Sequence, residues 1–401
     1  MEVKIERLDD LGQGVAFIDK KVTFVPKTVP GDIVDIKLTK IKKKYNEAML
    51  GDILVPSDAR IPFKCPYFLN CGGCQLQTMS YEDTTKYKLN KVTSLFTKNK
   101  IDVSFALIEN PKPFNYRNKI NLKIVDGKLG FFEINTHKMV EIDACLIADE
   151  VINETIILVK NFNILNGNVT IKCNQDNEVL IIIESNDLLN IDIDLINSKI
   201  NLVGIVINRE TYYGKNYLYE TINDLKFKIS YDSFFQVNPY VASKLFQIIT
   251  DNVDANDKIM DLYCGVGTLS LSAAREAREV VGIEVVKNAI ANALENARIN
   301  NLDNVSFILN DVSAEVDKMD INFSKVIVDP PRSGLSRKVI DFLIKIMPEE
   351  IIYVSCDPQT LVRDYKLLQE YYKIKKGYVL DMFSYTHHVE SILILKKRSE
   401  I

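Results

Sequence analysis

One cysteine of this chain stands where a nucleophile would be effective. Cys356 follows an apolar run over residues 351–354 that predicts a strand, and Asp357-Pro358 opens a predicted helix directly after it. The dipole of a helix N-terminus favours the thiolate form of a cysteine. An isolated cysteine is more often a buried structural residue, but the motifs described below favour a catalytic thiolate here.

Three side chains near the C-terminal end are candidates for a general base. His387, His388 and Glu390 lead into the apolar run 392–395, which predicts the last strand. Imidazole and carboxylate groups both serve as proton acceptors in enzymes. The residue types alone leave open which of the three would act.

A glycine-containing turn predicts a nucleoside site. Gly265 and Gly267 follow the predicted strand 258–263 and open a helix, so a ligand can approach the backbone there. Glu284 ends the next predicted strand, about twenty positions later, where a carboxylate accepts hydrogen bonds from ribose hydroxyls. The turn lacks the third glycine that a dinucleotide's pyrophosphate needs. A nucleoside without pyrophosphate fits better, and S-adenosylmethionine (SAM) is the common ligand of that kind.

Two further strand ends complete the predicted site. Asn310-Asp311 closes strand 305–309 and is placed to reach an adenine edge. Residues 329–332, D-P-P-R, close strand 325–328, and their prolines stiffen the rim of a substrate pocket because proline fixes φ. Methylases of adenine and cytosine amino groups have an aromatic residue in place of Arg332, which argues against amino-group methylation.

A thiolate beside SAM indicates one kind of reaction. Carbon 5 of uracil is too weak a nucleophile to attack a sulfonium methyl, but a thiolate added to carbon 6 creates an enolate that attacks through carbon 5. A base must then remove the carbon 5 proton before the thiolate can leave. Methylation of cytosine at carbon 5 shares this addition, but it needs a proton donor at N3 for which no motif is present.

A cysteine cluster predicts a second kind of site. Cys65, Cys71 and Cys74 follow the pattern C-x5-C-G-G-C, in which the two glycines let the chain wrap closely around a metal centre. Zinc knuckles have paired C-x2-C units, and this segment has one pair plus an outlier. The chain has seven cysteines, an odd number, which favours metal binding or catalysis over structural disulfides. The fourth ligand must come from elsewhere.

The patterning of the chain predicts three domains. Residues 1–57 alternate like a small β-barrel, and residues 58–230 contain the cysteine cluster and a mainly β region. A helix over residues 81–98 is expected to pack on the last domain. From residue 231 strands alternate with helices, which indicates an α/β domain with a largely parallel sheet. The strands are expected at 258–263, 279–284, 305–309, 325–328, 351–354 and 392–395.

The overall charge excludes a uniformly basic nucleic-acid coat protein. The net charge is −4, and the most basic segment is a run of five lysines. Such a run is usually a solvated face. These lysines are Lys37, Lys40, Lys42, Lys43 and Lys44. No apolar run has the length of a membrane span and residues 1–10 do not resemble a signal peptide, so we expect a cytoplasmic protein.

Taken together, the motifs resemble those of the RNA uracil-C5 methyltransferase family, in particular its iron–sulfur branch that acts mainly on ribosomal RNA. The resemblance spans nearly the whole chain, with five motifs in the same order. They are F-Q-x-N at 235–238, the glycine motif at 261–267, D-P-x-R at 329–332, the nucleophile motif at 355–358 and the base motif at 388–390.

The resemblance implies a role for each motif. It implies a Rossmann-like SAM-dependent domain, an N-terminal TRAM barrel that binds RNA through the lysine run, and Glu390 rather than a histidine as base. It implies that Cys145 completes a [4Fe-4S] site with Cys65, Cys71 and Cys74. SAM would be held by Gln236, Tyr263, Glu284 and Asp329, in addition to Gly265 and Asp311.

The substrate implied is a uridine of 23S ribosomal RNA, turned out of its stack to reach Cys356. Phe234, Phe235 or Phe131 could stack on bases, although each is more often a core residue. We expect a monomer that binds RNA and neither DNA nor a membrane. The alternatives are a transfer-RNA uracil-C5 methyltransferase and a non-catalytic iron–sulfur RNA-binding protein. Typical bacterial transfer-RNA members lack the barrel and the cluster, so the presence of both favours ribosomal RNA.

Overall fold

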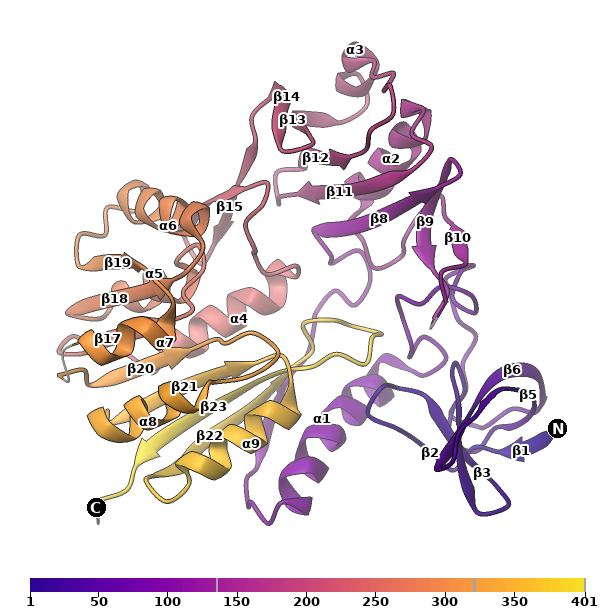
Figure 1. Ribbon diagram of the computed structural model, residues 1–401, viewed down its shortest axis with the longest axis horizontal. Coiled ribbons are helices and arrows are strands. Elements are labelled where there is room, and N and C mark those ends of the chain that lie inside the picture. Colours follow the sequence, from indigo (N-terminus) through magenta and orange to yellow (C-terminus); the bar gives the residue numbers. More distant parts are fainter. Residues whose placement is uncertain (135, 320–321, 400–401) are drawn as a thin grey trace.

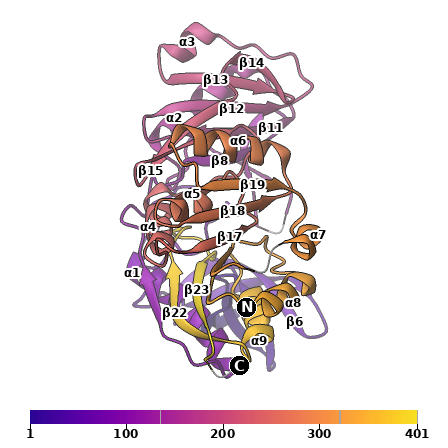
Figure 2. The ribbon, with the colours of Figure 1, turned by 90° about the vertical axis from the view of Figure 1, so that its left-hand side faces the viewer.

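The computed structural model describes residues 1–134, 136–319 and 322–399. It shows three β-rich parts, with the barrel and the catalytic sheet on either side of helix α1 (Tyr81–Lys98) and the central sheet above them (Figure 1). Turned by 90°, the central sheet stacks on the end of the catalytic part (Figure 2). No helix in these ranges is long and apolar enough to cross a membrane.

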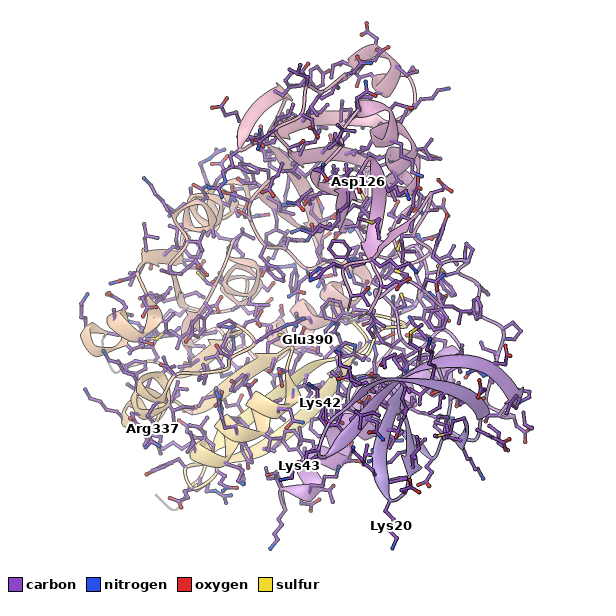
Figure 3. The ribbon with its side chains drawn as sticks, turned by 45° about the vertical axis from the view of Figure 1, so that its right-hand side comes forward. Lys20, Lys42, Lys43, Asp126, Arg337 and Glu390 are labelled. Carbon is purple, nitrogen blue, oxygen red and sulfur yellow. The ribbon has the colours of Figure 1, made fainter. Side chains whose placement is uncertain are left out.

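The N-terminal part is a six-stranded sheet with the order β1-β5-β6-β4-β3-β2. In β5, Val34 and Ile36 are buried while Lys37 and Lys40 are exposed, as the alternating sequence predicts. The lysine run ends in the exposed turn between β5 and β6, where Figure 3 labels Lys42 and Lys43. The strands are β1 (Glu2–Lys4), β2 (Arg7–Leu8), β3 (Gly14–Ile18), β4 (Lys21–Val25), β5 (Ile33–Ile41) and β6 (Tyr45–Val55).

The central part is a seven-stranded sheet with the order β10-β9-β8-β11-β12-β13-β14. Its core joins the buried face of α2 (Glu150–Val159) to aliphatic side chains of the strands. The strands are β8 (Lys119–Val125), β9 (Lys128–Phe132), β10 (Met139–Glu141), β11 (Gly167–Cys173), β12 (Glu178–Glu184), β13 (Asn201–Ile207) and β14 (Glu210–Gly214). The short helices are α3 (Ile193–Asn197) and the 3₁₀ turn Lys160–Phe162.

The C-terminal part is an eight-stranded sheet with the order β19-β18-β17-β20-β21-β23-β22-β7. In this order the strands β19, β18, β17, β20 and β21 run parallel to one another. β23 is antiparallel to both β21 and β22. All six predicted strands are present, and β22 is an additional one. The strands are β7 (Phe105–Ile108), β17 (Lys258–Leu262), β18 (Glu279–Glu284), β19 (Val305–Leu309), β20 (Lys325–Val328), β21 (Glu350–Ser355), β22 (Tyr372–Leu380) and β23 (Glu390–Lys397).

Helices cover both faces of this sheet, as a largely parallel sheet requires. One buried cluster joins the strands to α1, α8 and α9, and a second joins them to α4, α5 and α6. The helices are α4 (Pro239–Thr250), α5 (Thr268–Ala274), α6 (Lys287–Ile299), α7 (Val312–Glu315), α8 (Arg337–Ile346) and α9 (Pro358–Leu368), with the 3₁₀ turn Val316–Lys318 after α7.

Two segments within the range predicted for the central domain lie with the catalytic sheet instead. β7 pairs with β22 at the edge of that sheet, and Val92 and Phe96 of α1 pack into its core. The hairpin of β15 (Tyr217–Ile222) and β16 (Leu225–Ser230) contributes Phe227 to the core on the other face. The catalytic part is therefore assembled from two stretches of the sequence, one with α1 and β7 and one that begins at β15.

Candidate active site

The glycine turn lies at the carboxyl end of β17, as the sequence predicts. Gly265 and Gly267 have φ values of 56° and 84°, in the left-handed region that glycine adopts most easily. A Cβ on Gly267 would lie 2.6 Å from Leu271 Cδ1, whereas a Cβ on Gly265 would meet no atom within 4 Å. Gly265 therefore faces open space. Tyr263, predicted as the end of the strand, already belongs to the turn, with φ of 68°.

Glu284 is held against this turn. Its Oε2 accepts a hydrogen bond from the Gly265 N–H at 3.1 Å, and its Oε1 accepts from the Val285 and Val286 N–H groups at 2.9 Å each. A carboxylate fixed in this way at the end of the second strand is oriented for the ribose role that the sequence predicts.

A buried carboxyl group, that of Asp261, and a half-buried one, that of Asp329, lie near the turn. Ser270 Oγ donates to Asp261 Oδ2 at 2.5 Å, while Asp261 Oδ1 has no hydrogen-bond partner among the described residues. Burial raises the pKa of Asp261 to about 7, and Asp329 and Glu284 add to the rise. Burial also raises the pKa of Asp329 to about 7. A cation bound beside these groups would relieve their mutual repulsion.

The remaining predicted cofactor residues are Tyr263, Asp311 and Gln236. Tyr263 is half-buried, and Asp311 lies close enough to raise its pKa, after burial, to about 12. Asp311 Oδ1 also caps α7 by accepting from the Ala314 N–H at 3.2 Å. Gln236 is buried and precedes Asn238, which caps α4 and donates to Met382 O at 3.3 Å. Asp329 lies beside the strand that ends in the turn, since its N–H donates to Leu262 O at 3.4 Å.

Cys356 and Glu390 are neighbours across two strands. Ser355, the last residue of β21, pairs with Ser391 of the antiparallel β23. Cys356 therefore follows at the point where Glu390 begins β23. Glu390 is buried, and its Oε1 has no hydrogen-bond partner among the described residues. Figure 3 labels Glu390 near the middle of the molecule.

The position of Cys356 before a helix predicts a thiolate, but the surroundings of this pair favour the protonated forms of both groups. Burial, together with the nearby Glu390 and Asp329, raises the pKa of the Cys356 thiol to about 11, and Arg332 opposes the rise. Burial and Asp329 likewise raise the pKa of Glu390 well above its usual value. The N-terminus of α9 does not overcome desolvation, so the free site holds a protonated thiol.

The two histidines lie beside this pair but are poor bases. Burial lowers the pKa of His387 to about 4 and that of His388 to about 3, and Lys91 and Arg332 contribute to both. A group with so low a pKa has little tendency to take a proton. These low pKa values therefore favour Glu390 over either histidine as the general base.

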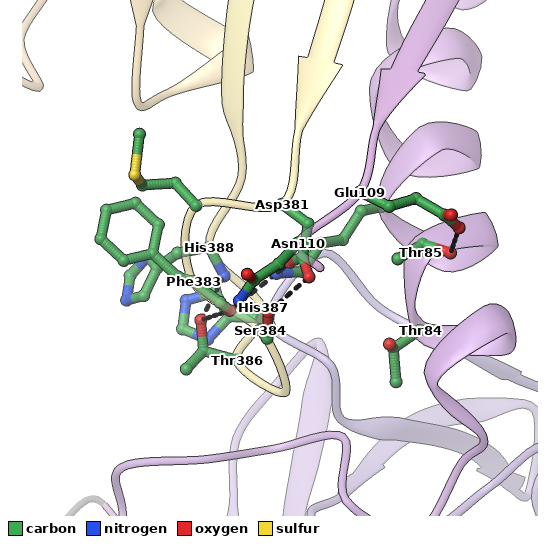
Figure 4. Close-up of polar contacts among 12 residues, drawn as sticks. Thr84, Thr85, Glu109, Asn110, Asp381, Phe383, Ser384, Thr386, His387 and His388 are labelled. Carbon is green, nitrogen blue, oxygen red and sulfur yellow. Dashed lines mark hydrogen bonds and ion pairs between the residues drawn. The ribbon is translucent and has the colours of Figure 1, made fainter. Parts of the chain in front are cut away.

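A buried polar network holds the segment before Glu390 (Figure 4). Lys88 Nζ donates to Asp381 Oδ1 at 2.5 Å and to Phe383 O at 2.8 Å, and both charged side chains are 1% exposed. Ser384 Oγ donates to Asp381 Oδ2 at 2.6 Å and accepts from Asn110 Nδ2 at 2.9 Å. These partners are up to 295 residues apart in the chain, so no local pattern identifies them.

The four predicted cysteine ligands line one cavity of about 300 Å³. Burial raises the pKa of the Cys74 thiol to about 12 and that of Cys145 to about 11. The buried ammonium of Lys27 donates to the carbonyl oxygens of Cys71 and Cys74. Within the described ranges, no three Cys, His, Asp or Glu side chains are close enough to hold a single metal ion.

Cys264, to which the sequence assigns no role, and the three aromatic candidates divide between core and surface. Cys264 is buried, and its Sγ would lie 2.9 Å from a Cβ on Gly282, so it fills core space. Phe235 is buried against Phe227, with ring centroids 5.7 Å apart, whereas Phe234 is 67% exposed. Phe131 is half-buried and lines the cysteine cavity.

A largely parallel sheet with a glycine turn, a carboxylate at the end of the second strand and further acidic groups at its carboxyl edge is the arrangement of a SAM-dependent methyltransferase. A family description reading tRNA (Uracil-5-)-methyltransferase matches residues 80–398, and one reading TRAM domain matches residues 1–50. The chain therefore belongs to the tRNA (uracil-5-)-methyltransferase family and is an RNA uracil-C5 methyltransferase that uses SAM.

Individual relatives are similar over their whole length. An uncharacterized RNA methyltransferase of Caldanaerobacter subterraneus is 34% identical, covering 98% of each chain, and one of Clostridium acetobutylicum is 32% identical, covering 99% of this chain and 96% of the relative. Among solved structures, the Pyrococcus abyssi tRNA (uracil-54, C5)-methyltransferase in complex with S-adenosyl-L-homocysteine is similar with a TM-score of 0.81, 28% identity, and coverage of 98% and 100%.

Proposed function

We propose that this enzyme methylates carbon 5 of a uridine in 23S ribosomal RNA, with Cys356 as nucleophile and Glu390 as general base. The observation that supports these roles best is the register of β21 and β23, which brings the thiol and a buried carboxyl with an unpartnered oxygen to the same sheet edge. The edge also contains the SAM turn, as expected for ligands of open α/β sheets.

The reaction follows from these two groups. Cys356 Sγ gives up its proton and forms a bond to carbon 6 of the uracil, which makes carbon 5 nucleophilic. SAM supplies the methyl group that carbon 5 takes. Glu390 then accepts the proton of carbon 5, the electrons of that carbon–hydrogen bond restore the double bond between carbons 5 and 6, and the bond between Sγ and carbon 6 breaks with its electrons leaving on sulfur as the thiolate. The net products are 5-methyluridine, S-adenosylhomocysteine and one proton.

The residues of the SAM site fit the cofactor. We assign the ribose to Glu284, the adenine side to Tyr263 and Asp311, and the remaining contacts to Gln236, Gly265 and Asp329. The open space at Gly265 leaves room for the ligand. Asp261 and Asp329 favour a sulfonium cation, because a positive charge lowers the cost of ionising both carboxyl groups.

We assign a [4Fe-4S] cluster to Cys65, Cys71, Cys74 and Cys145. Each thiolate of such a cluster binds a different iron, so the sulfur atoms stand further apart than the ligands of one ion, which agrees with four thiols spread around a shared cavity. Burial lowers the pKa of Lys27, and thiolates at Cys74, Cys71 and Cys65 would oppose that by favouring its ammonium form. A cluster here would fix the chain from residue 65 to 74 against the central sheet, and the reaction above does not use it.

The barrel is placed to present RNA to the site. Tyr87 OH donates to Asp9 O at 2.7 Å, and Gln359 Nε2 donates to Asp10 Oδ2 at 3.2 Å. Gln359 is in the first turn of α9, directly after Cys356 and its cap Asp357. The β2–β3 turn of the barrel therefore contacts the nucleophile's helix, and RNA held by the lysine run would lie along this junction.

The second candidate substrate is transfer RNA. The Pyrococcus abyssi protein, which covers nearly the whole chain, acts on tRNA according to its name. We favour ribosomal RNA because the chain combines a barrel with four clustered cysteines, the combination that the resemblance associates with ribosomal substrates. The non-catalytic alternative is opposed by the family membership.

The deciding experiment measures tritium release from RNA labelled at uridine carbon 5. Release from 23S ribosomal RNA by the wild-type enzyme, and its loss in Cys356→Ala, would support reaction, nucleophile and substrate together. Release from transfer RNA alone would overturn the substrate and leave the chemistry. No release from either RNA by enzyme that binds SAM would refute the proposed reaction.

A further inference from the structure

The segment between β22 and β23, residues 381–389, leads directly to Glu390 and has no helix or strand of its own. We call it the base loop. Its backbone and side chains are held mainly by residues from elsewhere in the chain, as Figure 4 shows for Asn110 and Ser384. The position of Glu390 relative to a substrate therefore depends on what holds this loop.

One flank of the base loop is held by the cysteine segment. The N–H groups of Gln75 and Leu76, directly after Cys74, both donate to Tyr385 O at 3.0 Å. Gln75 Oε1 accepts from the His387 N–H at 3.2 Å and lies 3.1 Å from His387 Nδ1. Its Nε2 donates back to Gly72 O at 3.0 Å. The buried amide of Gln75 thus links the C-G-G-C turn to the base loop.

The other flank is held by α1. Besides the Lys88 contacts described above, Lys91 Nζ donates to His387 O at 2.9 Å. His387 is therefore held at its N–H by Gln75 and at its carbonyl by Lys91. Only two residues separate it from Glu390.

Glu390 lacks an anchor of its own on one side. Its pairing with Leu380 and the Ser355–Ser391 pair fix the backbone of β23, but its Oε1 has no partner among the described residues. The direction of the carboxyl group therefore depends on the backbone entering β23 from the base loop. A loosened loop would change the distance between this oxygen and the proton it must take.

We propose that Gln75 is a positioning residue for proton removal from carbon 5, acting through His387 and the base loop. The cysteine segment, besides holding a cluster, would then set the geometry of the base. The inference rests on the proposed role of Glu390. It concerns the second half of the reaction, after the methyl group has been transferred and before the enzyme–RNA bond is broken.

The test compares tritium release with the amount of enzyme bound covalently to methylated RNA on denaturing gels. Gln75→Met keeps the side-chain volume and removes both amide hydrogen bonds, so we expect roughly tenfold slower release and accumulation of the adduct. Gln75→Glu keeps the acceptor for the His387 N–H and should restore most of the release. Asn252→Leu, which removes another buried amide bond far from the loop, should show no adduct.

Two further measurements separate the possible failures. Glu390→Gln should accumulate more adduct than any other variant, and its failure to do so would refute the base assignment itself. If Glu390→Gln accumulates the adduct as expected, tritium release at the wild-type rate by Gln75→Met would overturn the role of Gln75 and leave the role of Glu390 intact. So would an equal loss of methyl transfer and release without adduct, or a loss of iron in Gln75→Met, since each indicates a structural role.

Discussion

Replacing Lys88 by methionine tests how strongly α1 holds the catalytic sheet. Lys88 and Asp381 are each 1% exposed, and Nζ lies 2.5 Å from Oδ1. Methionine fills most of the lysine's volume but leaves Asp381 as a buried charge without its cation. The same change removes the donor to Phe383 O.

The magnitude follows from the contacts that remain. Removing one partner of a buried ion pair costs about 3–5 kcal/mol. Asp381 keeps hydrogen bonds from Tyr81 OH at 2.9 Å and Ser384 Oγ at 2.6 Å, which places the loss near the lower end. An unsatisfied Phe383 carbonyl adds about 1 kcal/mol. We expect Lys88→Met to lower the free energy of unfolding by about 4 kcal/mol.

The assay is urea denaturation followed by circular dichroism and by tyrosine fluorescence, which the chain permits because it has 18 tyrosines and no tryptophan. Asp381→Asn and the double variant complete a thermodynamic cycle. In the double variant the asparagine oxygen still accepts from Tyr81 and Ser384 without an unpaired charge, so we expect a coupling energy of about 2 kcal/mol. Additive losses, or a loss under about 1 kcal/mol for Lys88→Met, would refute the buried ion pair.

Three other predictions concern the site and its pH dependence. Gly265→Ala should cost only about 1–2 kcal/mol of stability, because its Cβ meets no atom but its φ is 56°, and it should lower SAM affinity in calorimetry. Alkylation of Cys356 by iodoacetamide should rise with pH toward its pKa of about 11, and Arg332→Gln should slow it at every pH below that value, as mass spectrometry can measure. Burial raises the pKa of Glu220 from 4.5 to about 7. Between these pH values the folded chain binds more protons than the unfolded chain, so the free energy of unfolding falls as pH rises through them. Glu220→Gln should remove that fall, at most about 3 kcal/mol, in denaturation at pH 5 and pH 8.

The sequence predicts those parts of the fold that are encoded locally. Each parallel strand of the catalytic sheet is an apolar run, because both of its faces are covered by helices. β22 has no such run, since Lys373, Lys375 and Lys376 interrupt it near the sheet edge. β7 is a short run whose partner lies some 270 residues away, so its pairing depends on the tertiary fold.

The same distinction applies to the site. Gly265, Glu284, Cys356 and Glu390 each sit at a strand end, and the order of strands brings them to one edge. The protonation of Cys356 could not be predicted, because burial outweighs the helix N-terminus and burial is a property of the folded chain. Gln75 and Lys88 were missed for a similar reason, since their partners lie about 300 residues away.

The raised pKa values have a common cause that bears on the order of the reaction. Asp329 raises the pKa of both Cys356 and Glu390, and Arg332 is the cation that opposes it in each case. A single added positive charge near Asp329 would therefore favour ionisation of all three groups together. SAM is a cation and its demethylated product is not, so in the proposed reaction SAM bound beside Asp329 would make the thiol easier to ionise than the product would. The proposed nucleophile would then be activated mainly when the methyl donor is in place.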